Sequence, residues 1–151
     1  MLQWHELKKI VEDGALEKLG RCANVQKKYV TYLAHLRAEW DSVTDYVLVS
    51  KFNYSQVVKS DQKKAALRPK AVESRIVTAS NDFPYHFDAG MEHFILWKTG
   101  SSITNDDITE GIQKLTHERN AADSVFYINP PELRSILDLD HCHIILKCGC
   151  S

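Results

Sequence analysis

The feature that most constrains the fold is a pair of short apolar runs in the last third of the chain. The runs cover residues 125–128 and 144–146, and each predicts a buried β-strand. Asn129, Pro130 and Pro131 follow the first run. Proline fixes φ and lacks a backbone donor, so these residues end the first strand and predict a loop. The chain therefore needs a β-sheet in this region, with a polar loop beside it.

The second of these strands is expected over 142–147. Two histidines alternate at its start, one just before the strand and one within it. His141 and His143 are two positions apart, so they share one face of an extended backbone, while Cys142 faces the other way. The adjoining loop adds three polar side chains, Asn129, Arg134 and Ser135. Two imidazoles on one strand face beside a polar loop form the most site-like arrangement in the sequence.

Upstream, the spacing of apolar residues predicts three helices within residues 1–50. The first covers 3–12, the second is capped by Asn24 and runs to Trp40, and the third starts at Asp41 or Ser42. Residues 51–74 are polar and basic, which predicts a solvated loop or a mobile lid over the site. Residues 75–79 read as a strand.

The middle of the chain predicts one more strand and one more helix. In the strand over 93–98, His93, Ile95 and Trp97 share a face. Thr104 caps a helix over 105–119. Before the strand, we expect an aromatic turn at Phe83, Pro84 and Tyr85. This turn either packs against the core or offers its rings to a ligand.

These elements predict an α+β fold with N-terminal helices and a small, mainly antiparallel sheet carrying one packed helix. We expect one domain over 1–151, with a helical part at 1–50, the loop or lid at 51–74, and a sheet-containing part at 75–147.

Composition excludes several classes of protein. A net charge of -1 argues against a general nucleic-acid binder, and no apolar run is long enough to span a membrane. The start of the chain lacks the apolar centre of a signal peptide. The 4 cysteines do not form a secreted disulfide pattern. A soluble protein of the cytoplasm or nucleus is expected.

Several segments together resemble one known family. They are WHELKKIVEDGALEKLGR, LRAEWDSVTDYVL, NDFPYHFDAGMEHFILW, FYINPPELRSI and LDHCHIIL. In this order they are similar to a eukaryotic and viral family of unknown function that includes the fungal N-acetylglucosamine-induced proteins. That name describes induction by a sugar and implies no substrate.

A weaker similarity, to histidine-triad hydrolases and nucleotidyltransferases, suggests a chemistry. Those proteins run strand, helix, strand, loop and strand, with alternating histidines on the last strand. Leu139 stands two residues before His141, so this chain carries a pair of histidines there and not a triad. The resemblance implies that His141 attacks phosphorus or acts as a base, while His143 binds phosphate.

The same resemblance gives the loop its roles: Arg134 and Ser135 would hold the developing charge, and Asn129 would orient an imidazole. The complete candidate site is Tyr85, His93, Asn129, Arg134, Ser135, His141 and His143. The expected ligand is a phosphorylated small molecule such as a nucleotide, and no cofactor is predicted.

Two alternatives remain open at this point. In one, the histidines are structural and the chain is a non-enzymatic interaction or regulatory protein, viral or cellular. In the other, His93, His141 and His143 bind a metal, with Cys148 and Cys150 as further ligands.

Overall fold

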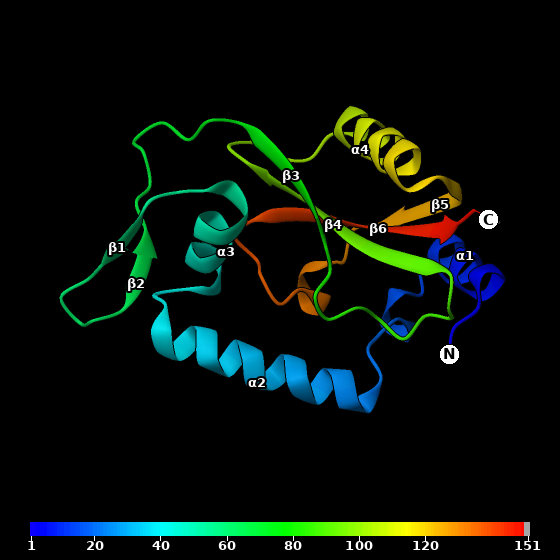
Figure 1. The fold of residues 1–151 in the computed structure, drawn as a ribbon, viewed down its shortest axis with the longest axis horizontal. Coiled ribbons are helices and arrows are strands. Elements are labelled where there is room, and N and C mark those ends of the chain that lie inside the picture. Colours follow the sequence, from blue (N-terminus) through cyan, green and yellow to red (C-terminus); the bar gives the residue numbers. More distant parts are fainter. Residues whose placement is uncertain (150–151) are drawn as a thin grey trace.

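The computed structural model describes residues 1–149 and shows a central antiparallel sheet with helices on both of its faces (Figure 1). The helices are α1 (Trp4–Asp13), α2 (Ala23–Glu39), α3 (Val43–Phe52) and α4 (Asn105–Arg119), with short 3-10 turns η1 (Leu16–Lys18) and η2 (Pro131–Leu133). The strands are β1 (Gln56–Val58), β2 (Lys64–Ala66), β3 (Arg75–Ser80), β4 (Met91–Thr99), β5 (Ala121–Tyr127) and β6 (Asp140–Cys148). The predicted α+β class is confirmed.

The main sheet has the strand order β3-β4-β6-β5, so the last strand in sequence lies between two earlier ones. Every neighbouring pair is antiparallel. The predicted strands at 93–98, 125–128 and 142–147 all belong to this sheet, as expected from their apolar patterns. β5 starts earlier than predicted, at Ala121, and stops at Tyr127.

One face of the sheet packs on α4 and forms the driest part of the core. The buried residues there are Phe94, Leu96, Ile108, Leu115, Cys142, Ile144 and Leu146. α4 begins as predicted, because the Thr104 side chain accepts from the Asp107 amide and the Asp107 carboxylate accepts from the Thr104 amide. Gly111 allows the helix to approach closely, since a Cβ there would lie 2.6 Å from Leu96 Cδ1.

The opposite face is covered at its two ends, and the histidines lie between them. At one end α1 places Leu7 against Tyr127 and Ile145. At the other end, α3 packs Val47, Leu48 and Phe52 against a cluster that contains Trp97 and Leu139. In Figure 1, α1 and α3 lie at opposite ends of this layer, and α2 runs along the side of the molecule away from α4.

The prediction of a loop over 51–74 is wrong in part, because β1 and β2 pair there as an antiparallel hairpin. Its turn is closed by Asp61, whose carboxylate accepts from the Lys63 amide, and Ala65 and Ala66 are buried. Three-residue strands give too short an alternation to be recognised in a basic sequence.

The second helix also starts earlier than predicted. Cys22 occupies the cap position without a side-chain hydrogen bond, and Asn24 lies inside the first turn. The third helix begins at Val43 with Ser42 as its cap, as expected. Within residues 1–149, no helix combines the length and apolar character needed to cross a membrane.

Candidate functional site

The sheet brings three histidines together, and we call His93, His141 and His143 the histidine cluster. In the pairing of β4 with β6, Ile95 stands opposite His143 and Trp97 opposite His141. The three imidazole residues are buried, with exposed fractions of 6%, 7% and 4% in chain order. They lie on the middle part of the sheet face, between the ends that α1 and α3 cover.

The bonding around His93 fixes which of its nitrogens carries the proton. The Asn81 side-chain oxygen accepts from the Phe83 amide at 2.9 Å, which turns the Asn81 amide nitrogen toward the His93 ring, 3.4 Å from Nδ1 and 3.5 Å from Nε2. The Tyr85 backbone N–H also points at His93 Nδ1, at 3.4 Å. A backbone N–H can only donate, so Nδ1 accepts from Tyr85 and the His93 proton is assigned to Nε2.

This assignment passes on to His143. His93 Nε2 and His143 Nδ1 lie 2.7 Å apart, so His93 donates and His143 Nδ1 accepts. A neutral His143 therefore carries its proton on Nε2. That nitrogen lies 3.4 Å from the Asn129 side-chain amide, which also lies 3.4 Å from the Tyr85 hydroxyl. The Asn129 side-chain oxygen is therefore assigned to the position that faces His143 Nε2 and the Tyr85 hydroxyl. There it accepts from the His143 Nε2–H and from the Tyr85 O–H.

His141 has the opposite arrangement. Its Nδ1 lies 2.9 Å from the Leu139 carbonyl oxygen, which only accepts, so Nδ1 holds the proton. Nε2 then carries a lone pair, and the hydrogen bond of the His141 side chain within residues 1–149 is made through Nδ1. The Trp97 ring packs on the imidazole with centroids 4.8 Å apart. His141 is therefore oriented as a nucleophile, base or ligand through Nε2.

Burial keeps the histidine cluster neutral. It lowers the pKa of His93 to about 3, and the positive charge of Arg21 adds to the effect. Burial also lowers the pKa of His143 well below its ordinary value, with His93 and His141 as further causes. For His141, burial again lowers the pKa and outweighs the opposing effect of the Leu139 carbonyl. At neutral pH the Nε2 lone pair of His141 is available.

A cavity of about 80 Å³ lies over this face, and we call it the histidine cavity. Its lining consists of Arg21, Tyr29, Tyr85, Ile95, Trp97, Asn129, Leu133, Arg134, Ser135, Ile136, His141 and His143. The volume suits several waters or one small oxyanion group. No residue of the expected 51–74 lid takes part in this lining.

The loop after β5 forms one wall of the histidine cavity. η2 turns the chain at Pro131, and the Arg134 Nε then donates to the Asn129 carbonyl at 2.6 Å. This bond folds the loop onto itself and leaves the other guanidinium N–H groups of Arg134 free to act as donors. Ser135 follows directly and is exposed.

Six of the seven residues predicted from the sequence line this cavity, namely Tyr85, Asn129, Arg134, Ser135, His141 and His143. His93 lies behind His143 and touches the cavity only through it. From this position His93 can orient the His143 ring, but it does not reach a ligand in the cavity.

Two further residues were not singled out by the sequence. Arg21 stacks on Tyr29 with its guanidinium carbon 3.8 Å from the ring centroid, and its Nε donates to the Phe83 carbonyl at 2.7 Å. Asn81 orients His93, as described above. Both come from segments far from the histidine pair in sequence, and no local pattern marks them.

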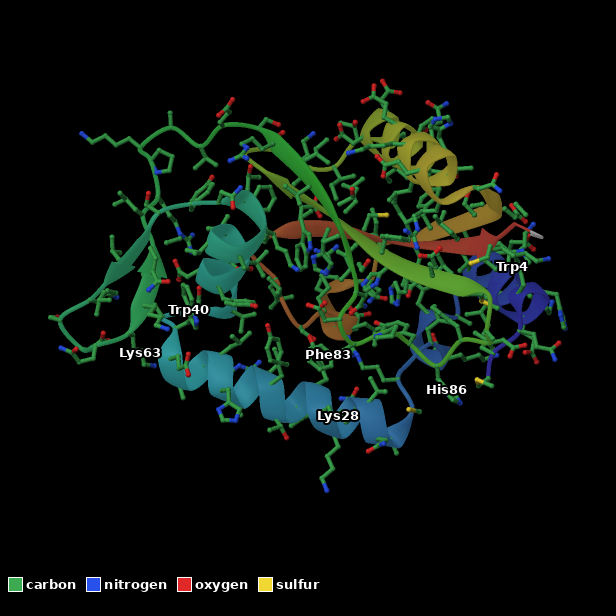
Figure 2. The ribbon with its side chains drawn as sticks, in the orientation of Figure 1. Trp4, Lys28, Trp40, Lys63, Phe83 and His86 are labelled. Atoms are coloured by element: carbon green, nitrogen blue, oxygen red, sulfur yellow. The ribbon has the colours of Figure 1, made fainter. Side chains whose placement is uncertain are left out.

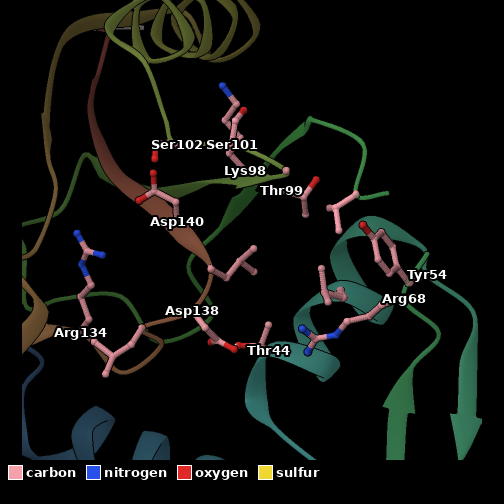
Figure 3. A pocket seen from close by; sticks show the side chains of 15 residues that line it. Thr44, Tyr54, Arg68, Lys98, Thr99, Ser101, Ser102, Arg134, Asp138 and Asp140 are labelled. Carbon is pink, nitrogen blue, oxygen red and sulfur yellow. The ribbon is translucent and has the colours of Figure 1, made fainter. Parts of the chain in front are cut away.

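A larger cleft of about 740 Å³ lies at the end of β4 and the start of β6 (Figure 3). Two cations of its lining are already paired, Lys98 with Asp107 and Arg68 with Asp45. Arg134 lines both this polar cleft and the histidine cavity. His141 lines the histidine cavity and does not line the polar cleft.

The residues of the metal alternative make other contacts in the structure. His93 and His143 bond to each other, and Cys148 Sγ lies 3.7 Å from Glu92. No three His, Cys, Asp or Glu side chains within the described chain converge as metal ligands. Cys150, the other predicted ligand, lies outside the described residues.

Comparison with known proteins places the chain in a family. A family model described as "Protein of unknown function (DUF3605)" matches residues 3–147. The chain belongs to this family. The match confirms the predicted membership in a family of unknown function.

Two further comparisons find proteins similar to this chain. The uncharacterized protein YPL067C of Saccharomyces cerevisiae is 24% identical over 160 residues, which cover 95% of this chain and 78% of the yeast protein. A solved structure titled "Crystal Structure of HTC1" superposes with a TM-score of 0.64 at 21% identity, covering 99% of this chain and 86% of the other. At 21% identity, the similarity to the HTC1 structure shows the fold of this DUF3605 protein and does not indicate its activity.

Proposed function

We propose that this DUF3605 protein binds a phosphorylated small molecule in the histidine cavity and hydrolyses it through His141. The observation that carries the proposal is the bond from His141 Nδ1 to the Leu139 carbonyl, which leaves the Nε2 lone pair unpartnered beside the cavity. A neutral imidazole held in this tautomer is a competent nucleophile toward phosphorus.

The reaction has two steps. His141 Nε2 forms a bond to phosphorus as the bond from phosphorus to the ester oxygen breaks, and the leaving oxygen takes a proton from water. The imidazole becomes positively charged, and its Nδ1–H continues to donate to the Leu139 carbonyl. The hydroxide then attacks phosphorus, the bond to Nε2 breaks, and phosphate and neutral imidazole are released.

The cavity wall supplies donors for the negative oxygens of phosphorus. Arg134 offers its free guanidinium N–H groups, Ser135 a hydroxyl, and His143 the Nε2–H fixed by His93. The His143 contact to Asn129 is 3.4 Å, long for a hydrogen bond, so an anionic oxygen competes well for this proton. Donors placed before the charge develops favour the transition state.

The second candidate is a non-enzymatic interaction protein with structural histidines. It is favoured by His93, whose two ring nitrogens both have partners in the protein. It leaves the unpartnered nitrogen of His141 without a role.

The test compares wild type with His141→Asn, which preserves polarity and most of the side-chain volume. Calorimetry with inorganic phosphate, AMP, UMP and glucose 6-phosphate measures binding. Phosphorus NMR follows ester hydrolysis and the acid-labile phosphohistidine. The matched control is His117→Asn, an exposed histidine on α4 at the opposite face of the sheet.

We expect wild type and the control to bind at least one member of the panel and to form phosphohistidine. His141→Asn should lose turnover by roughly 10³-fold or more while remaining folded. Absence of binding by the wild type to the whole panel, together with a clear fall in the melting temperature of His141→Asn, would show that the histidines are structural.

A further inference from the structure

A second cavity of about 100 Å³ adjoins the histidine cavity, and we call it the tyrosine cavity. The two share five lining residues, Arg21, Tyr29, Ile95, Trp97 and Ile136. The rest of its lining comes from α2, from α3 and from the turn after β3. A group bound at His141 therefore lies close to this space, across a common wall.

Aromatic side chains build the walls of the tyrosine cavity. Tyr32 of α2 lies 4.9 Å from the Phe83 ring and 6.1 Å from the Tyr46 ring, measured between centroids. Tyr29, one turn earlier, lies 5.3 Å from Phe83. Figure 2 shows Phe83 next to α2, on the side that faces the sheet. The aromatic turn thus contributes a ring to a cavity as well as to packing.

The cavity is apolar inside, with its charged groups at the rim. Leu33, Leu36 and Val47 complete the inner wall and are buried. Burial and the Tyr46 hydroxyl raise the pKa of Tyr32, so its phenol stays neutral. Lys51 and Asp82 lie at the edge, 3.9 Å apart and directed at each other. Such a lining disfavours a charged occupant and favours a flat, weakly polar one.

We propose that the tyrosine cavity receives an aromatic ring of the phosphorylated molecule whose phosphate lies at His141. This inference rests on the proposed function, and it names the substrate class as esters of phosphate that carry an aryl group or a nucleobase. Its volume alone is below the roughly 150 Å³ of a dry cavity that binds benzene. The adjoining histidine cavity adds about 80 Å³ on the other side of the shared lining residues.

Arg21 occupies the junction between the two cavities. Its guanidinium carbon lies 3.8 Å from the centroid of Tyr29, which lines both cavities, and 5.0 Å from the centroid of Tyr85, which lines only the histidine cavity. A positive charge at this point pairs with phosphate oxygens, and its stacking face continues the aromatic wall. The ester linkage of the substrate would lie beside it.

Binding of three simple probes measures the ring separately from the phosphate. Calorimetry compares phenyl phosphate with methyl phosphate, and 4-methylphenol reports on the ring alone. Two variants alter the cavity: Val43→Phe fills it, and Tyr32→Leu removes one ring of its wall. The matched control is Val30→Phe, the same replacement at an exposed position on α2 outside both cavities.

We expect phenyl phosphate to bind roughly tenfold to a hundredfold more tightly than methyl phosphate. Val43→Phe should abolish that preference and Tyr32→Leu reduce it, while methyl phosphate binding stays the same. Val30→Phe should behave as wild type. If Val43→Phe does not fold, the loss of preference in Tyr32→Leu is the deciding result.

The outcomes separate this inference from the proposed function. Equal binding of methyl and phenyl phosphate by the wild type would overturn the ring site and leave the phosphate site standing. Binding of 4-methylphenol that is sensitive to Val43→Phe, without binding of any phosphate, would support the ring site and refute the phosphate site. Failure of all three probes to bind would overturn both.

Discussion

Acid should destabilise this protein well before its carboxylates titrate, because the histidine cluster is neutral in the folded state. The pKa of His93 is about 3 when folded and 6.5 ordinarily, so the unfolded chain binds more protons between these values. Stability from this group is complete above pH 6.5 and falls as the pH drops toward 3. At pH 5 the loss from His93 alone is about 2 kcal/mol of unfolding free energy.

The other two members of the cluster act in the same direction, since burial lowers the pKa of both His141 and His143. The carboxyl groups of Asp45 and Asp123 have lowered pKa values, so their contributions are lost only at more acid pH. A pH range from 8 to 5 therefore isolates the histidines.

Urea unfolding, followed by tryptophan fluorescence at several pH values, measures this loss. The variant His93→Gln should be less stable than wild type at pH 8 but lose less stability on acidification, by about 1.4 kcal/mol per pH unit at most. His117→Asn, at an exposed site, should retain the wild-type slope. An unfolding free energy that is constant from pH 8 to 5, or histidine NMR titrations near pH 6.5 for the cluster, would refute the reasoning.

Three further predictions follow from individual contacts. Asn81→Asp retains the acceptor for the Phe83 amide but removes the donor to His93, so nitrogen-15 NMR should show a changed tautomer at His143; unchanged ring shifts would exclude the hydrogen-bond relay. Gly111→Ala should destabilise the protein by about 1 to 3 kcal/mol through overpacking, whereas Gly20→Ala, with open space around it, should be neutral in the same melting experiment. Thr104→Ala should cost about 1 kcal/mol by removing the cap of α4, and an unchanged melting temperature would contradict that role.

Local patterns were sufficient to predict the elements that carry the histidines. Alternation placed His141 and His143 on one strand face, and the Thr104 cap with its following acidic residues located the start of α4. Both signals lie within a few residues of the structure that they determine. This locality is why the sheet and its packed helix could be predicted without coordinates.

Contacts between distant segments could not be predicted in this way. Arg21 reaches the histidine cavity through its bond to the Phe83 carbonyl, 62 residues away. The early part of β5 has no apolar alternation, and it is held by Asp123, which accepts from Trp4 and Lys8 of α1. Tyr29 and Tyr32 lie at helical spacing on α2, and this spacing does not reveal that they line a cavity.

The position of β6 between β4 and β5 also affects how the protein is made. During synthesis, β4 and β5 leave the ribosome without the strand that joins them, because residues 140–148 are translated later. Until β6 is made, β5 lacks its hydrogen-bonding partner. The apolar face of α4 also lacks the β6 residues that pack on it. From the synthesis of β4 until that of β6, the nascent chain therefore carries exposed strand edges, a state in which chaperone binding and aggregation compete with folding.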